Sequence, residues 1–177
     1  MTLRDYIESL RHKTVAVIGI GVSNTPLLEL LLAEGIRVTA CDKRSREQMG
    51  EQAEHLEQLE QLGCELHLGA DYLKDLDADV IFRTPGLRPD VPEIAACVDR
   101  GAVLTSEMEV FFEVCPCTII AVTGSDGKTT TTTIIAELLK AAGKRVWVGG
   151  NIGHPLLCEA DGMLATDYAV LELSSFQ

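Results

Sequence analysis

The stretch Thr118-Ile-Ile-Ala-Val-Thr123, followed directly by Gly124-Ser-Asp-Gly-Lys-Thr-Thr130, decides the fold of the second half of the chain. Its first part is rich in β-branched residues, which is typical of a strand covered on both faces of a parallel sheet. We expect a Gly-rich turn after it and a helix from Lys128 to Ala142 that ends at Gly143. In such a strand–turn–helix, N–H groups of the loop and of the helix N-terminus face one place, where they can bind a phosphate.

The side chains of this loop have the chemistry that nucleoside triphosphate binding requires. Lys128 can reach the β- and γ-phosphates, and the hydroxyl of Thr129 can hold Mg²⁺. The spacing departs from the usual G-x-x-x-x-G-K-[ST] pattern, because Val122 stands where the first glycine would fall and Gly124 lies only three positions before Gly127. A Gly-rich turn with an incidental lysine is the alternative. The predicted ATP-binding residues are Gly124, Ser125, Asp126, Gly127, Lys128, Thr129 and Thr130.

Strands and helices alternate in the first half of the chain, from Thr14 to Thr105. Apolar runs predict strands at 14–20, 37–41, 65–68, 80–83 and 103–105. Pro26 suits the first turn of a helix that ends at Gly35, and the very polar residues 45–62 are expected to form a second helix. This alternation predicts parallel βαβ units and a doubly wound, Rossmann-like α/β sheet.

A second glycine motif, Gly19-Ile-Gly21-Val-Ser-Asn24, follows the first strand, and Asp42 ends the second strand. Dinucleotide-binding folds use this layout, with glycines near the pyrophosphate and the acid on a ribose. Asparagine replaces the third glycine, so the motif indicates a nucleotide or nucleotide sugar, with NAD or a structural turn as alternatives. Asp42-Lys43-Arg44 adds two cations, and Thr84-Pro85-Gly86 follows another strand at the same edge of the sheet.

Two further candidates stand at strand ends in the second half. Strands are expected at 145–149 and 168–173, with a loop at 150–163 between them. Asn151 lies within Gly149-Gly-Asn-Ile-Gly153, where glycines permit tight turns close to a ligand. Glu172 ends the last strand near the expected place of Thr129, which makes it a candidate Mg²⁺ ligand.

The organisation of the chain changes near 106–117, where a helix at about 106–114 and Cys115-Pro116-Cys117 interrupt the alternation. We therefore predict two domains, a Rossmann-like domain at 1–106 and an incomplete P-loop ATPase domain at 107–177. The second is called incomplete because three strands and one long helix are few for an independent nucleotide-binding domain.

Composition and charge exclude several classes of protein. Lys and Arg number 15 and Asp and Glu 27, giving a net charge of −12, so nucleic acids and anionic membrane surfaces would repel the chain. Hydrophobic residues at 46% and charged residues at 24% are typical of a globular protein. No apolar run approaches the ~20 residues of a membrane-spanning helix. The polar N-terminus lacks a signal peptide, so we expect a cytoplasmic protein.

The cysteines and histidines show no metal-ligand spacing. The only close pair is Cys115 and Cys117, which lacks the two-residue spacer of zinc and thioredoxin-like sites. We expect the thiols to be small buried hydrophobes. The cysteines are Cys41, Cys64, Cys97, Cys115, Cys117 and Cys158.

Taken together, TGSDGKTT at 123–130, GGNIG at 149–153, LELSSFQ at 171–177, and GIGVSN with DKR in the first half resemble the Mur ligases. The P-loop variant is shared with folylpolyglutamate synthases, whereas GGNIG with ELSSFQ behind a Rossmann-like domain points to the branch that adds D-glutamate. Asp126 stands where that family more often has asparagine. The resemblance implies three domains, for a UDP-linked substrate, ATP and the amino acid. This chain matches the first and the opening part of the second.

The resemblance implies an ATP- and Mg²⁺-dependent ligase of peptidoglycan synthesis, monomeric, that joins D-glutamate to UDP-N-acetylmuramoyl-L-alanine through an acyl phosphate. Lys128 would neutralise the β/γ-phosphates, Thr129 and Glu172 would hold Mg²⁺, and Asn151 would orient the sugar-peptide. The residues that match the uridine-nucleotide pocket are Val22, Ser23, Asp42, Lys43, Arg44 and Gly86. Because the matched part lacks the amino-acid-binding domain, we expect no ligase activity from these residues alone.

An NAD-binding oxidoreductase or a nucleotide-sensing module built on residues 14–105 is the alternative. It accounts for the first glycine motif and Asp42, but it leaves the second phosphate loop without a role.

Overall fold

The computed structural model describes residues 1–88 and 90–174. Contacts divide the chain into two compact units, one formed by Ile7–Glu107 and the other by Met1–Tyr6 together with Met108–Gln177. The division lies beside the boundary expected from the sequence, and the assignment of domains at 1–106 and 107–177 stays a prediction. Pro89 of the loop after 80–83, and the last three residues of the LELSSFQ motif, lie outside the described residues.

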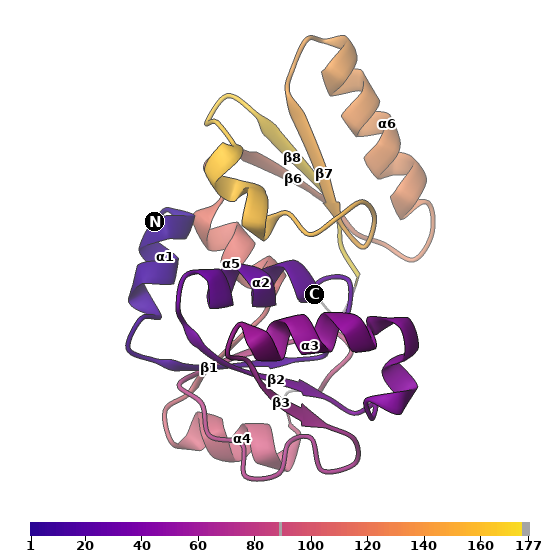
Figure 1. The fold of residues 1–177 in the computed structure, drawn as a ribbon. Helices are drawn as coiled ribbons and strands as arrows, with labels where there is room; N and C mark the ends of the chain where they lie inside the picture. Colours follow the sequence, from indigo (N-terminus) through magenta and orange to yellow (C-terminus); the bar gives the residue numbers. More distant parts are fainter. Residues whose placement is uncertain (89, 175–177) are drawn as a thin grey trace. The chain divides into compact units, whose positions relative to one another are not determined.

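The first unit is built on a five-stranded parallel sheet (Figure 1). Its strands are β1 (Thr14–Ile18), β2 (Arg37–Asp42), β3 (Glu65–Leu68), β4 (Val80–Arg83) and β5 (Val103–Thr105). Their order is β3-β2-β1-β4-β5, and every pair is parallel. The chain thus runs outward from β1 to β3 and returns to β4 on the other side of β1. The carboxyl ends of β1 and β4 flank this reversal of strand order, where open α/β sheets bind ligands.

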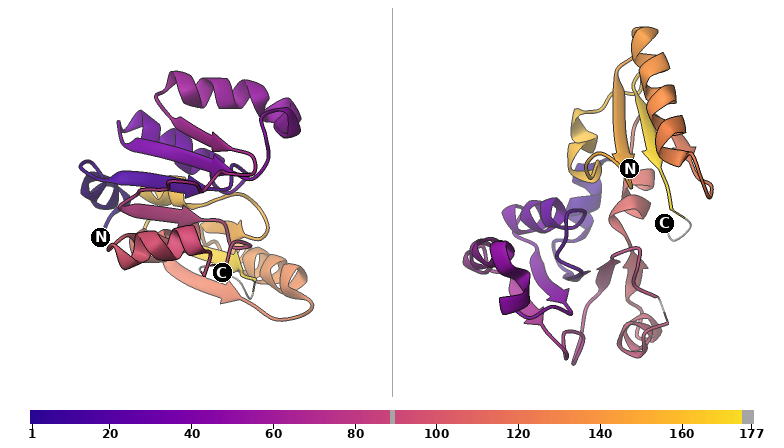
Figure 2. Two further views of the ribbon diagram at one scale, coloured as in Figure 1. Left: turned by 90° about the horizontal axis from the view of Figure 1, so that it is seen from below. Right: turned by 90° about the vertical axis from the view of Figure 1, so that its right-hand side faces the viewer.

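Helices cover both faces of this sheet. Helices α2 (Thr25–Ala33) and α3 (Ala53–Gln61) lie on one face, and α4 (Pro92–Asp99) lies on the other (Figures 1 and 2). A proline stands in the first turn of both α2 and α4, as a fixed φ and a missing N–H allow. The buried side of α2 consists of leucines at helical spacing, Leu27, Leu28, Leu31 and Leu32.

The expectation of one continuous helix over 45–62 is wrong. The segment forms a 3₁₀ turn, η1 (Glu47–Gln52), and then α3, because Gly50 has φ 54° and ψ −121°, outside the helical region. Met49, Leu56 and Leu59, expected on the apolar side of the segment, are nevertheless buried, whereas Leu62, expected with them, is 55% exposed.

The sequence analysis did not predict the first helix, α1 (Leu3–Ser9). Its N-terminus is capped reciprocally, since the Asp5 N–H donates to Thr2 Oγ1 at 3.1 Å and the Thr2 N–H donates to Asp5 Oδ2 at 2.9 Å. Thr-x-x-Asp is close to the capping-box pattern, and that signal could have located the helix.

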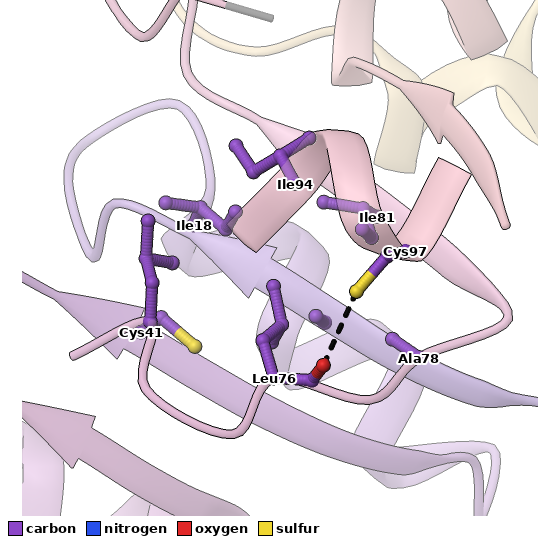
Figure 3. Packing of buried hydrophobic residues seen from close by; sticks show 9 residues of the cluster. Ile18, Cys41, Leu76, Ala78, Ile81, Ile94 and Cys97 are labelled. Atoms are coloured by element: carbon purple, nitrogen blue, oxygen red, sulfur yellow. Dashed lines mark hydrogen bonds between the residues drawn. The ribbon is translucent and has the colours of Figure 1, made fainter. Parts of the chain in front are cut away.

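A compact apolar cluster lies between the sheet of the first unit and α4 (Figure 3). Ile81 of β4 and Ile94 of α4 are fully buried in it. The thiol of Cys97 donates to the Leu76 carbonyl oxygen at 3.2 Å, which satisfies that group inside the core. Burial of the cysteines is confirmed for Cys41, Cys64 and Cys97, whereas Cys115, Cys117 and Cys158 are only partly buried.

The second unit contains a three-stranded parallel sheet of order β6-β8-β7. The strands are β6 (Thr118–Val122), β7 (Val146–Gly150) and β8 (Tyr168–Glu172), each within one residue of its expected bounds. Helix α6 (Lys128–Ala141) lies along one face, and a 3₁₀ turn, η2 (Leu157–Gly162), lies on the other (Figures 1 and 2). Helix α5 (Glu107–Val114) precedes β6. In the described part of the chain, none of the helices has the length and apolarity needed to cross a membrane.

Two residues one turn apart on α4 provide a test of this core. Ile94 is 0% exposed and Val98 is 41% exposed. We expect Ile94→Ala to lower the free energy of unfolding by about 2–5 kcal/mol, because it leaves a cavity between α4 and the sheet. Val98→Ala should change it by no more than about 0.5 kcal/mol. Urea unfolding followed by circular dichroism measures both, and equal effects of the two substitutions would contradict the packing described.

Candidate functional site

A pocket of about 450 Å³ opens at the carboxyl ends of β1, β2 and β4 in the first unit. All six residues predicted for the uridine nucleotide line it, namely Val22, Ser23, Asp42, Lys43, Arg44 and Gly86. The other lining residues are Ile18, Gly19, Gly21, Asn24, Tyr72, Thr84 and Leu87. The structure therefore brings these six predicted residues together around one pocket.

The carboxylate of Asp42, the last residue of β2, is buried and surrounded by donors. Its Oδ1 accepts from the Arg44 backbone N–H at 2.9 Å and from Arg44 Nε at 3.0 Å. Its Oδ2 accepts from the Ile20 N–H at 2.8 Å and from Arg44 Nη2 at 2.9 Å. A carboxylate has about four acceptor positions, so those of Asp42 are filled by the protein itself.

These contacts set the ionisation of Asp42. Burial opposes its negative charge, but the hydrogen bonds from Arg44 and from the Ile20 N–H outweigh burial and hold the pKa of Asp42 below its ordinary value. The group is therefore a carboxylate at neutral pH, and it fixes the glycine loop after β1 to the end of β2.

The Arg44 guanidinium is held by its edges. Besides the two bonds to Asp42, Nη2 donates to the Ile20 carbonyl at 2.8 Å and Nη1 donates to Gln52 Oε1 at 3.3 Å. One N–H of Nε, one of Nη1 and two of Nη2 are thus engaged, four of the five donors of the group. Because the side chain remains 39% exposed, what it offers to a ligand is its flat face, which suits stacking on a planar ring.

Asn24 takes a structural position where dinucleotide-binding motifs have a third glycine. It is 4% exposed, and its Nδ2 donates to the carbonyl oxygens of Ile18 at 3.2 Å and Gly19 at 3.0 Å. Gly19 has φ 94°, and a β-carbon there would lie 3.2 Å from the Thr84 side chain. The close approach of the loops after β1 and β4 therefore requires a residue without a side chain at this position.

The predicted site residues did not include Tyr72 and Leu87, which give the pocket an apolar part. Tyr72 follows β3 and Leu87 follows β4, and burial together with the Asp42 carboxylate raises the pKa of Tyr72. Their positions in the sequence, shortly after the carboxyl ends of two parallel strands, could have identified them as candidate pocket residues.

The predicted phosphate loop, Gly124–Thr130, joins β6 to α6 in the second unit. Gly127, directly before the helix, is left-handed with φ 71°, and among residues 1–88 and 90–174, adjacent residues aside, no atom lies within 4 Å of a β-carbon position at Gly124 or Gly127. The loop is therefore open on that side. Lys128 Nζ donates to the carbonyl oxygens of Gly124 at 2.9 Å and Ser125 at 3.2 Å, which keeps the ammonium over the loop.

Thr129 and Glu172 meet across the sheet edge, 43 residues apart in the sequence. Thr129 Oγ1 donates to Glu172 Oε2 at 2.6 Å, and Glu172 is 5% exposed. Two oxygen ligands of octahedral Mg²⁺ lie about 3 Å apart, so this pair needs to open by only a few tenths of an ångström to hold the ion. A buried carboxylate beside a hydroxyl is the hard oxygen set that Mg²⁺ prefers.

The glycine segment that begins at the end of β7 lies directly against Glu172. The Asn151 N–H donates to the Glu172 carbonyl oxygen at 2.8 Å, which places Asn151, with an exposed side chain, next to the Thr129–Glu172 pair. Gly150 has φ 90°, and a β-carbon there would collide with the Glu172 carbonyl oxygen. Asn151, predicted to orient the UDP-linked substrate, thus lies in the unit with the phosphate loop, whereas the other predicted residues of that substrate lie in the first unit.

Two family models match the chain. Residues 13–106 match the model described as Mur ligase MurD-like, N-terminal domain, and residues 122–177 match the Mur ligase middle domain.

Similar proteins are known from several bacteria. The chain is 51% identical over 176 residues to a UDP-N-acetylmuramoylalanine–D-glutamate ligase of Ruminiclostridium cellulolyticum, covering 99% of this chain and 37% of the relative. It is 52% identical over 171 residues to the ligase of the same name from Clostridium botulinum strain Hall, covering 96% and 37%. The solved UDP-N-acetylmuramate-alanine ligase of Thermotoga maritima is 24% identical, with a TM-score of 0.49 over 92% of this chain and 37% of that one. The chain thus spans about 37% of the length of these relatives.

The approach of Gly150 to Glu172 can be tested by substitution. We expect Gly150→Ala to lower the free energy of unfolding by about 2 kcal/mol or more, since the new methyl group meets backbone and φ 90° is strained for alanine. Gly162→Ala is the matched control, because its β-carbon would have Trp147 at 3.9 Å as nearest neighbour. Urea unfolding followed by the fluorescence of Trp147 measures both, and a stable Gly150→Ala variant would refute the close approach.

Proposed function

This chain belongs to the Mur ligase family, and we propose that it carries the substrate- and ATP-binding residues of a ligase that joins D-glutamate to UDP-N-acetylmuramoyl-L-alanine in peptidoglycan synthesis. The observation that carries the proposal is the meeting of Lys128, Thr129 and Glu172 at one sheet edge behind a glycine loop. Because such a reaction consumes ATP, which cells hold in the cytoplasm, the proposed location is the cytoplasm.

The residues of the second unit fit Mg²⁺–ATP. The open glycine loop and the start of α6 present N–H groups to phosphate. Lys128 would exchange its two carbonyl partners for β- and γ-phosphate oxygens, and Thr129 with Glu172 would hold the ion.

Phosphoryl transfer depends on positioning and on neutralisation of charge, and these are what the side chains supply. Bound ATP provides the γ-phosphoryl group that turns the substrate carboxylate into an acyl phosphate, from which the D-glutamate amine displaces phosphate to form the amide. Lys128 neutralises the charge that spreads over the phosphate oxygens. Asn151, held beside Glu172 by its backbone N–H, orients the carboxylate of the sugar-peptide.

The pocket of the first unit would hold the uridine nucleotide. Arg44 presents a flat face against which a pyrimidine ring stacks, and Lys43 remains as the cation for the diphosphate. Asp42 acts as a positioning residue, because its carboxylate orients Arg44 and the glycine loop.

The same geometry weighs against a dinucleotide-binding oxidoreductase. In that class the acid at the end of the second strand accepts hydrogen bonds from the ribose hydroxyls. The four acceptor positions of Asp42 are already filled by Arg44 and the Ile20 N–H, so a ribose would have to displace them.

The role of the phosphate loop predicts a specific loss of binding. We expect Lys128→Ala to weaken Mg²⁺–ATP binding at least tenfold, since a charge-assisted contact to phosphate is worth roughly 1.5–3 kcal/mol. Lys140→Ala is the matched control, because Lys140 is the basic residue in the last turn of the same helix and pairs with Glu137. Calorimetry measures both affinities, and unchanged binding by the Lys128 variant would remove the phosphate-loop assignment.

Stacking on Arg44 predicts a difference between arginine and lysine. Arg44→Lys keeps the charge but removes the planar group, so we expect UDP to bind about tenfold more weakly. Arg46→Lys, two residues away and paired with Glu60 on the surface, should leave the affinity unchanged. A titration with UDP and with NAD tests the proposal: tighter binding of NAD would favour the oxidoreductase, and equal UDP affinity of the Arg44 variant would exclude stacking.

A further inference from the structure

In the second unit, away from the phosphate loop, the sulfur of Cys117 lies beside two other sulfur atoms. Cys115 and Cys117 stand between α5 and β6, and Met163 follows η2. The two thiol sulfurs are 3.3 Å apart, and Cys117 Sγ lies 4.0 Å from Met163 Sδ across 46 residues of sequence. The thiols are partly buried and Met163 is 5% exposed. The cluster is placed at the amino end of β6, whereas the phosphate loop follows its carboxyl end.

The distances from Cys117 Sγ to the other two sulfurs are close to those of a three-coordinate metal site. A thiolate bound to a d¹⁰ ion has a metal–sulfur distance of about 2.3 Å, so the ligands of a trigonal site lie about 4.0 Å from one another. Cys117 and Met163 already have this separation, and Cys115 has to withdraw from Cys117 by about 0.7 Å. A rotation about χ1 of a partly exposed side chain accomplishes such a shift.

The acidic residue near the cluster, Asp167, is already engaged by other groups of the protein. The nearby carboxylate of Asp167 accepts at Oδ2 from Trp147 Nε1 and from the Leu164 N–H, both at 3.0 Å, and Arg145 lies 3.6 Å from the same oxygen. In the described part of the chain, no group of three or more His, Cys, Asp or Glu is placed to hold a metal. Zinc requires four ligands in structural sites, and harder cations require oxygen.

We propose that Cys115, Cys117 and Met163 form a binding site for one soft monovalent metal ion of the Cu(I) type. Two thiolates and a thioether are the soft donors that select Cu(I). Binding replaces the two thiol protons, which are released to solvent, and involves no change of oxidation state. The site is separate from the proposed ATP site, so loading does not require the phosphate loop.

Without metal, the pair is held by a hydrogen bond between the two thiols. In that bond the proton of one thiol points at the sulfur of the other. An incoming ion displaces that proton, as it does at other cysteine sites.

The test is a competition for Cu(I) by the whole 177-residue chain, fully reduced and under nitrogen. The chain is added to the coloured Cu(I)–bicinchoninate complex, and the loss of colour reports how much metal it withdraws. We expect one equivalent for the unchanged chain, none for Cys115→Ser or Cys117→Ser, and an affinity at least about tenfold weaker for Met163→Leu. The melting temperature should rise with Cu(I) only where metal is withdrawn.

Two controls and a conservative variant keep the test decisive. Cys158→Ser removes another partly buried cysteine of the same unit, and Lys128→Ala alters the phosphate loop; both should withdraw one equivalent. Met163→Leu preserves volume, so it decides the question even if a serine variant fails to fold. Failure of the unchanged chain to withdraw copper overturns the site, as does undiminished affinity of Met163→Leu or of either serine variant. A preference for Zn(II) in the same competition also overturns it.

Discussion

A buried carboxylate at the end of a parallel strand is the constraint on which both candidate sites depend. Asp42 ends β2 and Glu172 ends β8, and each is 5% exposed. A charge taken out of water has to be compensated by hydrogen bonds, and in each unit the compensating group is a residue assigned to ligand binding. Asp42 immobilises Arg44 and the glycine loop after β1, while Glu172 accepts a hydrogen bond from the Thr129 hydroxyl at the start of α6. The acids therefore order the binding residues before any ligand arrives.

Close approach of backbone segments is the second requirement, and it explains where glycine is needed. Gly150 brings the end of β7 against the carbonyl oxygen of Glu172, and the neighbouring Asn151 N–H then bonds to that oxygen. Gly19 similarly lets the loop after β1 pass the Thr84 side chain. At Gly150 and at Gly19, a side chain would push apart the strand ends that hold the site residues. Close packing and the geometry of the site therefore both require glycine at these positions.

The sequence predicted most strands closely because a strand buried in a parallel sheet has to be a short apolar run bounded by turn residues. β3, β4 and β5 have the bounds expected for them. The prediction failed where a local conformation broke the pattern, as at Gly50, whose positive φ divides the segment 45–62. It also omitted α1, whose Thr2–Asp5 cap is a short signal with little apolar periodicity behind it.

By itself, the sequence determined the alternation of strands and helices, the two glycine loops, and which polar residues follow the strands, because these depend on local propensity and on the common edge of parallel strands. Only the tertiary structure decided the strand order, the filling of the acceptor positions of Asp42, and the hydrogen bonds that hold the edges of the Arg44 guanidinium. It alone also brought Met163 to Cys117. These features are contacts between segments distant in the chain, and no local pattern encodes the distance and direction at which such segments meet.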